Sequence, residues 1–239
     1  MRHHHLLALG TALTLASLAG CSDPEGTAPD APAALAAGHD AGAHALPEGA
    51  LFVAELHPLN PRIQQTLDPD PRTPRGVAEG KAYFRVVNGM LDAVVDVRGA
   101  EPADAAFPEG LHPQHIHEAA SCPTMSADVN GDGIVDVIEG LPFYGPIMIP
   151  LDGDLADTSS QIPTFPLASG VRGSYHYAAS ASIAALEAAL HHALDLPTRH
   201  VVIHGVDLNT PLPASVQSLP GVPAQLTLPI ACGELRRIR

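Results

Sequence analysis

Two histidines stand one residue apart in a segment that alternates like a β-strand. Residues 110–118 read Gly-Leu-His-Pro-Gln-His-Ile-His-Glu, which places His115 and His117 at positions i and i+2. Side chains two residues apart on a strand point to the same face of the sheet. Two neutral imidazoles on one face chelate a single metal ion, and copper and zinc suit imidazole. The pair therefore predicts part of a metal site whose other ligands come from another element.

A second motif, residues 128–139, has the length and spacing of an EF-hand calcium loop. Such a loop supplies oxygens from positions 1, 3, 5, 7, 9 and 12, with glycine at position 6, and holds calcium at about 2.3–2.6 Å. The six ligand positions carry Asp128, Asn130, Asp132, Ile134 (through its backbone carbonyl), Asp136 and Glu139. We expect these oxygens to converge on one calcium ion. The alternative is an Asp- and Gly-rich turn that binds no ion.

The flanks of this loop differ from those of a paired EF-hand. Pro123 precedes the loop, and Gly140 and Pro142 follow it closely. Proline and glycine prevent long helices on either side. The chain also has only one such loop. We therefore expect a solitary structural calcium loop inserted in a β protein.

The amino terminus carries an export signal rather than a structural element. Residues 1–20 contain a short basic opening and an apolar run of signal-peptide length, which is too short to span a bilayer as a mature helix. The run ends in Leu-Ala-Gly-Cys, which resembles the bacterial lipobox, so Cys21 is the expected lipidation site. The alternative is an ordinary secretory signal with an incidental cysteine. A lipidated Cys21 makes a membrane the expected partner and places the protein in the bacterial cell envelope, periplasmic or at the cell surface.

The sequence then divides into a tether and one folded domain. Residues 21–49 are rich in Ala, Pro, Gly and Asp without apolar periodicity, which is typical of a flexible tether. Residues 50–239 form the expected domain. Its two remaining cysteines, Cys122 and Cys232, lie in a compartment where disulfides persist. They form either one bridge or two free thiols.

Composition excludes one class of partner and favours one class of fold. The formal net charge is −14, and a surface so acidic disfavours nucleic acid. Pro and Gly number 24 and 21, which favours short strands and turns. Alternating runs flank Asn88-Gly89, the strongest short-range signal for a hairpin. The other strands are expected at 51–56, 111–117, 145–151, 171–178, 200–205 and 225–232, with residues 61–76 as a loop. One helix is expected near 182–194, closed by Pro197.

The motif order resembles that of the copper–zinc superoxide dismutases, especially their bacterial periplasmic branch. The family's Gly-Leu-His-x-x-His-x-His-Glu segment corresponds to residues 110–118, and its cysteine five residues later to Cys122. Val-Val-Ile-His ends at His204, and Ala-Cys-Gly surrounds Cys232. The resemblance implies an all-β Greek-key sandwich in which these two cysteines form a disulfide. It also implies three copper ligands, His115, His117 and His204.

Other positions extend the resemblance or depart from it. His112 matches a structural histidine of the family, and Asp154 matches its zinc-ligating aspartate. The family's bridging histidine and two further zinc ligands have no counterpart, because no histidine lies between residues 118 and 175. Pro229 occupies the place of the arginine that guides superoxide. The comparison therefore implies a copper site without its zinc site and with weakened dismutation.

These observations predict a membrane-tethered, extracytoplasmic, superoxide dismutase-like protein that binds structural calcium and, at three histidines, copper. One alternative is a zinc-free copper oxidoreductase with residual superoxide dismutase activity. A weaker one is an adhesion or structural lipoprotein of the envelope. The sequence indicates no particular protein partner.

Overall fold

The computed structural model describes residues 46–66, 76–102, 110–119, 121–160, 164–170 and 172–239. The chain divides into two compact units, residues 1–41 and 42–239, and all described residues lie in the second unit. The expected signal peptide, most of the tether and Cys21 lie outside the described residues. Within the described part, no helix has the length and apolarity needed to cross a membrane.

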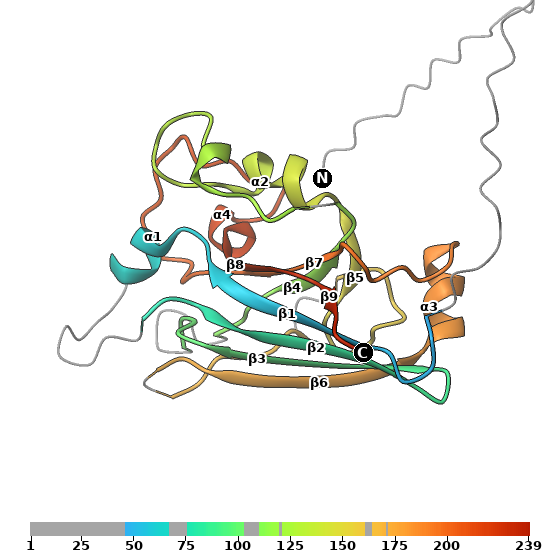
Figure 1. Cartoon of the computed structure of the whole chain (residues 1–239). Coiled ribbons are helices and arrows are strands. Elements are labelled where there is room, and N and C mark those ends of the chain that lie inside the picture. Colours follow the sequence, from blue (N-terminus) through green and yellow to red (C-terminus); the bar gives the residue numbers. More distant parts are fainter. Residues whose placement is uncertain (1–45, 67–75, 103–109, 120, 161–163, 171) are drawn as a thin grey trace, which may run out of the picture. The chain divides into compact units, whose positions relative to one another are not determined.

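The described residues form a curled antiparallel sheet with short helices at its periphery, which confirms the all-β prediction (Figure 1). Hydrogen-bonded neighbours follow the order β5-β4-β7-β8-β1-β2-β3-β6, and β9 pairs with β1. The strands are β1 (Leu51–Pro58), β2 (Glu79–Val87), β3 (Met90–Arg98), β4 (Gln114–His117), β5 (Ile147–Pro150), β6 (Tyr175–Ser182), β7 (His200–His204), β8 (Pro229–Glu234) and β9 (Arg236–Arg237).

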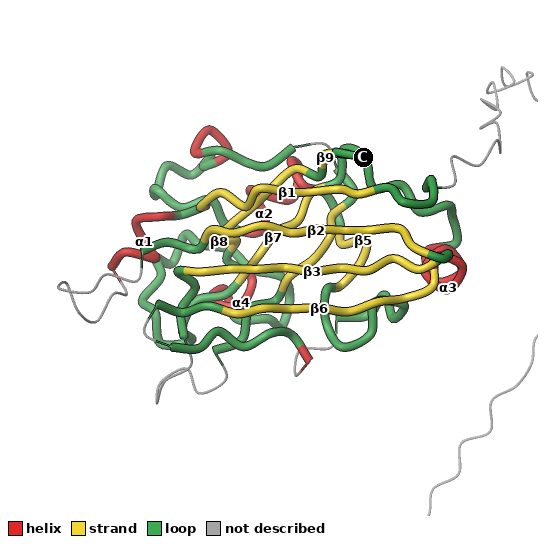
Figure 2. The backbone as a smooth tube through the Cα atoms, turned by 60° about the horizontal axis from the view of Figure 1, so that its bottom comes forward, coloured by secondary structure: helices red, strands yellow, loops and turns green. Residues whose placement is uncertain are grey.

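The hairpin expected at Asn88-Gly89 joins β2 to β3, and Figure 2 shows these long strands side by side with β1 and β6. Asn88 and Gly89 have φ values of 52° and 71°, the positive dihedrals that a two-residue hairpin turn needs. Val86 pairs with Leu91, and Phe84 pairs with Ala93. Because side chains alternate along a strand, these residues bury one face of the hairpin while charged residues occupy the other.

Strand β1 connects the two halves of the sheet. Its residues 51–56 pair with β2, whereas His57 and Pro58 pair with β8. The sheet therefore folds over itself as a sandwich does, with β1-β2-β3-β6 in one layer and β8-β7-β4-β5 in the other (Figure 1). The main apolar core contains side chains from both layers, such as Phe52, Phe84 and Ile116.

The helices are short and lie outside the strands. They are α1 (Pro61–Thr66), α2 (Val137–Tyr144), α3 (Ile183–Leu190) and α4 (Ala224–Thr227), with a 3-10 turn at Met125–Ala127. The prediction of a loop at 61–76 is wrong at its start, because proline favours the first helical turn and α1 begins at Pro61. The remainder of that loop, 67–75, lies outside the described residues.

Other boundaries also differ from the sequence prediction: β6 spans Tyr175–Ser182 rather than 171–178, and β4 begins at Gln114 rather than 111. The helix expected at 182–194 ends at Leu190, because His191 adopts φ 60° and terminates it before Pro197 is reached. The strand expected from 225 begins at Pro229, because residues 224–227 form α4. The position of α4 matters for the site, because this helix ends at Thr227, beside His204.

Candidate metal centre

Two neighbouring strands bring the predicted histidines together. β4 carries His115 and His117, and β7 carries His204 at its end. The two strands pair antiparallel with His115 opposite Val202, and the backbone N–H of His204 donates to the carbonyl of Pro113 at 2.8 Å. Alternation sends Ile116 into the main core and turns both β4 histidines to the other face.

The three rings form one buried cluster. The ring centroid of His115 lies 5.6 Å from that of His117 and 5.5 Å from that of His204, and the His117–His204 distance is 5.9 Å. One ring nitrogen from each histidine lies within 4.8 Å of the other two. Within the described chain, this is the one group of three or more His, Cys, Asp or Glu side chains whose ligand atoms gather so closely. The cluster can therefore hold a metal ion.

A hydrogen bond occupies one nitrogen of each ring. His117 Nδ1–H donates to the carbonyl of Gly145, and His204 Nδ1–H donates to that of Thr227, both at 2.8 Å. His115 Nε2 lies 3.2 Å from the hydroxyl of Ser160. The opposite nitrogens, Nδ1 of His115 and Nε2 of His117 and His204, are buried without a hydrogen-bond partner. Carbonyl partners of this kind fix the tautomer and orientation of metal-binding histidines.

Electrostatics keep the three rings neutral. Burial, followed by the neighbouring His204 and His117, holds the pKa of His115 well below its ordinary value of 6.5. Burial and the proximity of His204 lower the pKa of His117 to about 3, and burial lowers the pKa of His204 to about 4. A metal needs the lone pair of a neutral imidazole, so these rings need no deprotonation at neutral pH.

Aromatic side chains that the motifs did not predict pack around the histidines. Tyr144 lies at the end of α2, with its ring centroid 4.8 Å from that of His117, and its hydroxyl donates to the carbonyl of Val137 at 3.1 Å. The ring of Phe165 meets His115 edge-on at 5.3 Å. Neither residue stands at a diagnostic spacing from the histidines, so the sequence offered no signal for them.

His112 supports the cluster from the side, as the resemblance implies. It is fully buried, and its ring lies between the carbonyls of Glu101, 2.8 Å from Nε2, and His204, 3.2 Å from Nδ1. Its ring also stacks on Tyr175 at a centroid distance of 6.0 Å. His112 therefore contacts the backbone of His204 next to the point where the His204 N–H donates to Pro113.

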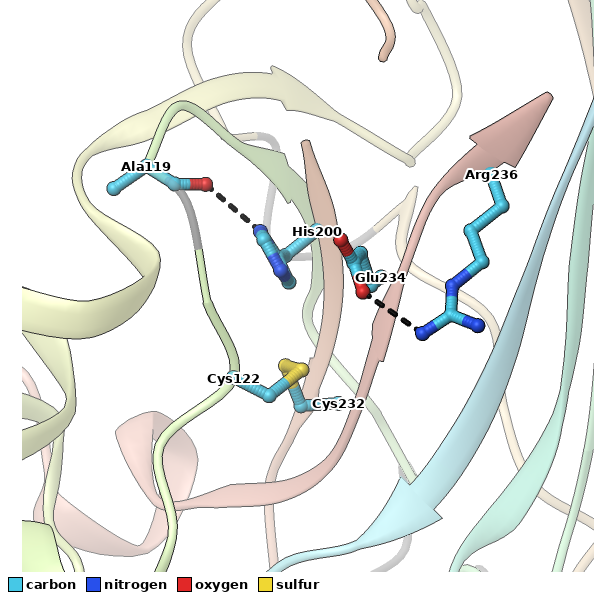
Figure 3. The surroundings of a disulfide bond; sticks show 6 residues. All are labelled: Ala119, Cys122, His200, Cys232, Glu234 and Arg236. Carbon is cyan, nitrogen blue, oxygen red and sulfur yellow. Dashed lines mark hydrogen bonds and ion pairs between the residues drawn. A yellow bond between two sulfur atoms is a disulfide. The ribbon is translucent and has the colours of Figure 1, made fainter. Parts of the chain in front are cut away.

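The expected disulfide is present and anchors the segment that follows β4 (Figure 3). Cys122 and Cys232 are bonded with their Cα atoms 5.8 Å apart, which joins this segment to β8. Close by, His200 Nδ1–H donates to the carbonyl of Ala119 at 2.8 Å. His200 is 1% exposed and holds the same segment.

The calcium-type loop is closed by hydrogen bonds to its own backbone. Asp128 accepts N–H groups from Gly131 and Gly133, and Glu139 accepts those of Val129 and Asn130. Asp136 caps α2 by accepting from Ile138 and Glu139, while Glu139 accepts in return from Asp136. The flanking helices are short, as the prolines predicted. Calcium ligation by Asp128, Asn130, Asp132, Ile134, Asp136 and Glu139 stays a prediction.

A buried asparagine fastens this loop to the sheet. The side-chain amide of Asn60 donates to the carbonyls of Val135 and Pro229 at 2.8 and 3.0 Å and accepts from the N–H of Val135 at 2.8 Å. On the other side, the Ser215 hydroxyl donates to Asp132, and the Gln217 N–H donates to Asp136, both at 2.6 Å. The loop thus connects α2 with the segment that precedes α4.

Other His, Cys, Asp and Glu side chains of the described domain do not join the cluster. Asp154, which matches the family's zinc-ligating aspartate, accepts the N–H of Ala156 at 3.0 Å in a loop after β5. His176 lies exposed on β6, where it contacts Asp96 at 2.7 Å. Pro229, at the position of the family's arginine, pairs with His204 at the start of β8.

A cavity of about 300 Å³ opens onto the three histidines. Its lining comes from β4, β7, α2, β5, the segment ending in α4, and Ser160 and Phe165.

A search of protein-family models finds no match for this chain, and a search of curated proteins finds none either. The likeness to superoxide dismutases therefore rests on the motifs, the disulfide and the geometry described above.

Proposed function

We propose that this protein binds copper at His115, His117 and His204. The observation that carries the proposal is the set of three buried, unpartnered ring nitrogens on one side of a rigid sheet. A buried polar atom without a partner is costly, and three of them in one cluster indicate a missing shared partner. Neutral imidazoles suit copper, and the motif order resembles that of a copper-binding family.

The residues have separable roles in holding the ion. His115, His117 and His204 supply the lone pairs, while Ser160 and the carbonyls of Gly145 and Thr227 orient the rings. Copper held by these residues would supply a one-electron redox centre. The aromatic ring of Tyr144 and that of Phe165 exclude water from two sides of the cluster.

We infer that the loop at 128–139 supports the histidine site and that the protein is anchored in the cell envelope. The EF-hand spacing of the loop favours a calcium ion. We assign this ion a structural role, because the segments that the loop joins form two walls of the cavity.

The lipobox-like Cys21 favours a membrane anchor in the cell envelope, and the disulfide is compatible with that location. Loss of detergent-phase partitioning on Cys21→Ser is the expected result; an unchanged membrane-bound fraction would contradict the anchor.

The copper proposal is tested by metal content and electron paramagnetic resonance of the purified protein. We expect about one copper per chain and nitrogen hyperfine structure from imidazole ligands. His204→Ala is expected to lose the copper, whereas the exposed His176→Ala serves as the matched control and keeps it. Retention of the full copper content by His204→Ala would contradict the proposal.

The alternative, a copper oxidoreductase with residual superoxide dismutase activity, follows from the family resemblance. No arginine stands at position 229, which is Pro229, and no zinc ligands accompany Asp154. We therefore expect any superoxide-decay rate of the copper-loaded protein to be far below that of an intact dismutase. A slow copper-dependent decay that is lost in His204→Ala would favour the alternative over copper binding alone.

A further inference from the structure

The cavity above the three histidines has apolar walls. Among the described residues that line it, none carries a charged side chain. The walls comprise Val137, Leu141, Ile147, Phe165, Val222 and Leu226. A volume of about 300 Å³ stands at the lower end of the range for protein sites that bind small molecules.

The hydroxyl groups that line this cavity form hydrogen bonds within the protein. The hydroxyl of Tyr144 donates to Val137, that of Thr227 bonds to Ser218 and Ala224, and that of Ser160 meets His115. Each of these three hydroxyls therefore already has a hydrogen-bond partner within the protein. The free lone pairs at the bottom of the cavity belong to the three histidines, which the proposed copper would occupy.

The rim of the cavity is apolar as well. Nine large hydrophobic residues are exposed in the described chain, and three of them, Leu141, Ile147 and Leu219, line this cavity. Their exposed fractions are 37–38%. Exposed apolar groups gathered around one opening are typical of a binding site.

We propose that this cavity binds a small uncharged molecule with one neutral donor atom for the metal and an apolar body against the walls. The proposal rests on the copper site proposed above and specifies what reaches it. An anion entering the cavity would lose its hydration and meet no charged side chain, so its binding would depend on the charge of the copper ion alone. An apolar body loses nothing by leaving water and gains from contact with Phe165, Val222 and Leu226.

The test is a ligand titration of the full-length, copper-loaded protein, followed by visible absorption and electron paramagnetic resonance. The probes are 4-phenylimidazole, imidazole and azide. We expect 4-phenylimidazole to bind at least about tenfold more tightly than imidazole, because its phenyl ring buries apolar surface. Azide is expected to bind more weakly than 4-phenylimidazole.

A rim variant tests whether the ligand lies in this cavity. Leu219→Lys introduces a cation at the opening and should weaken 4-phenylimidazole binding while strengthening azide binding. Leu208→Lys is the matched control, since Leu208 is also exposed but does not line the cavity. Equal behaviour of the two variants would overturn the proposal, because the ligand would then bind elsewhere.

The failures of the two proposals are distinguishable. Copper binding with azide as the tightest ligand, or with no preference for the phenyl group, overturns the apolar site and leaves the copper site intact. Failure of the protein to take up copper at all overturns both.

Discussion

The hydrogen-bond partners of the three histidine rings determine which ring nitrogens remain without a partner. Carbonyl oxygens accept but never donate, so Gly145 and Thr227 force the protons of His117 and His204 onto Nδ1 and leave Nε2 free. His115 turns the other way, with Nδ1 free. Because the rings are oriented by backbone atoms of other segments, a substitution that shifts α2 or α4 changes the site without touching a ligand.

The burial of His117 and His204 predicts how the free energy of unfolding of the metal-free protein depends on pH. The folded pKa values of His117 and His204, about 3 and about 4, lie below the ordinary 6.5. Below pH 6.5 the unfolded chain therefore binds protons that the folded rings do not, and the free energy of unfolding falls as pH falls. For His204 this loss extends down to about pH 4.

We expect His204→Leu to reduce this pH dependence. Removal of one such group should lower the slope of unfolding free energy against pH by about 1.4 kcal/mol per pH unit between about pH 4 and 6.5. Urea unfolding of both metal-free proteins at several pH values measures it. Identical slopes of unfolding free energy against pH for the variant and the unmodified chain would show that His204 is not neutral in the folded protein over this pH range.

At the scale of elements, the loop at 128–139 acts on the histidine site through the two segments it fastens. α2 begins at the loop's last positions and ends in Tyr144, whose ring contacts His117. Gln217, bonded to Asp136, belongs to the segment that continues to Leu219 and Val222 in the cavity wall. A disturbance of the loop therefore reaches two walls of the cavity.

We expect calcium to raise the melting temperature, because an ion bound only by the folded protein stabilises it. The double variant Asp132→Ala, Glu139→Ala should abolish this shift. His204→Ala should keep it, because the two sites use different ligands. Differential scanning calorimetry with and without calcium gives the readout. A full calcium shift in the double variant would refute calcium binding by this loop.

At the scale of the whole molecule, local signals predicted some elements and could not predict others. The turn at Asn88-Gly89 and the shared face of His115 and His117 depend on neighbouring residues, so the sequence revealed them. Asn60 and Tyr144 act on residues distant in the chain, with no spacing to mark them.

The pairing of His115 and His117 with His204 was predictable only through the family resemblance. His204 lies 87 positions beyond His117, so nothing local links the two strands. The helix boundary at His191 also escaped prediction, because histidine carries no strong sequence signal for the left-handed conformation that it adopts there.

The disulfide is the one covalent constraint on this long-range arrangement in the described chain. It joins residues 110 positions apart and holds the segment after β4 against β8. A bridge over a loop of this length reduces the entropy of the unfolded chain, which corresponds to about 5 kcal/mol in the loop-closure model. Most of its effect therefore lies in the unfolded state rather than in contacts of the folded one.

We expect the double variant Cys122→Ala, Cys232→Ala to lose about 5 kcal/mol of unfolding free energy in denaturant titrations, by the same loop-closure relation. Its metal-free fold should survive at low temperature, because the strands that carry the histidines keep their ladder of hydrogen bonds. Reduction of the unmodified protein is the matched control and should give a similar loss. If both treatments shift stability by less than about 1 kcal/mol, the unfolded chain is already held compact by other means. The unfolded chain would then retain structure that limits its entropy without the bridge.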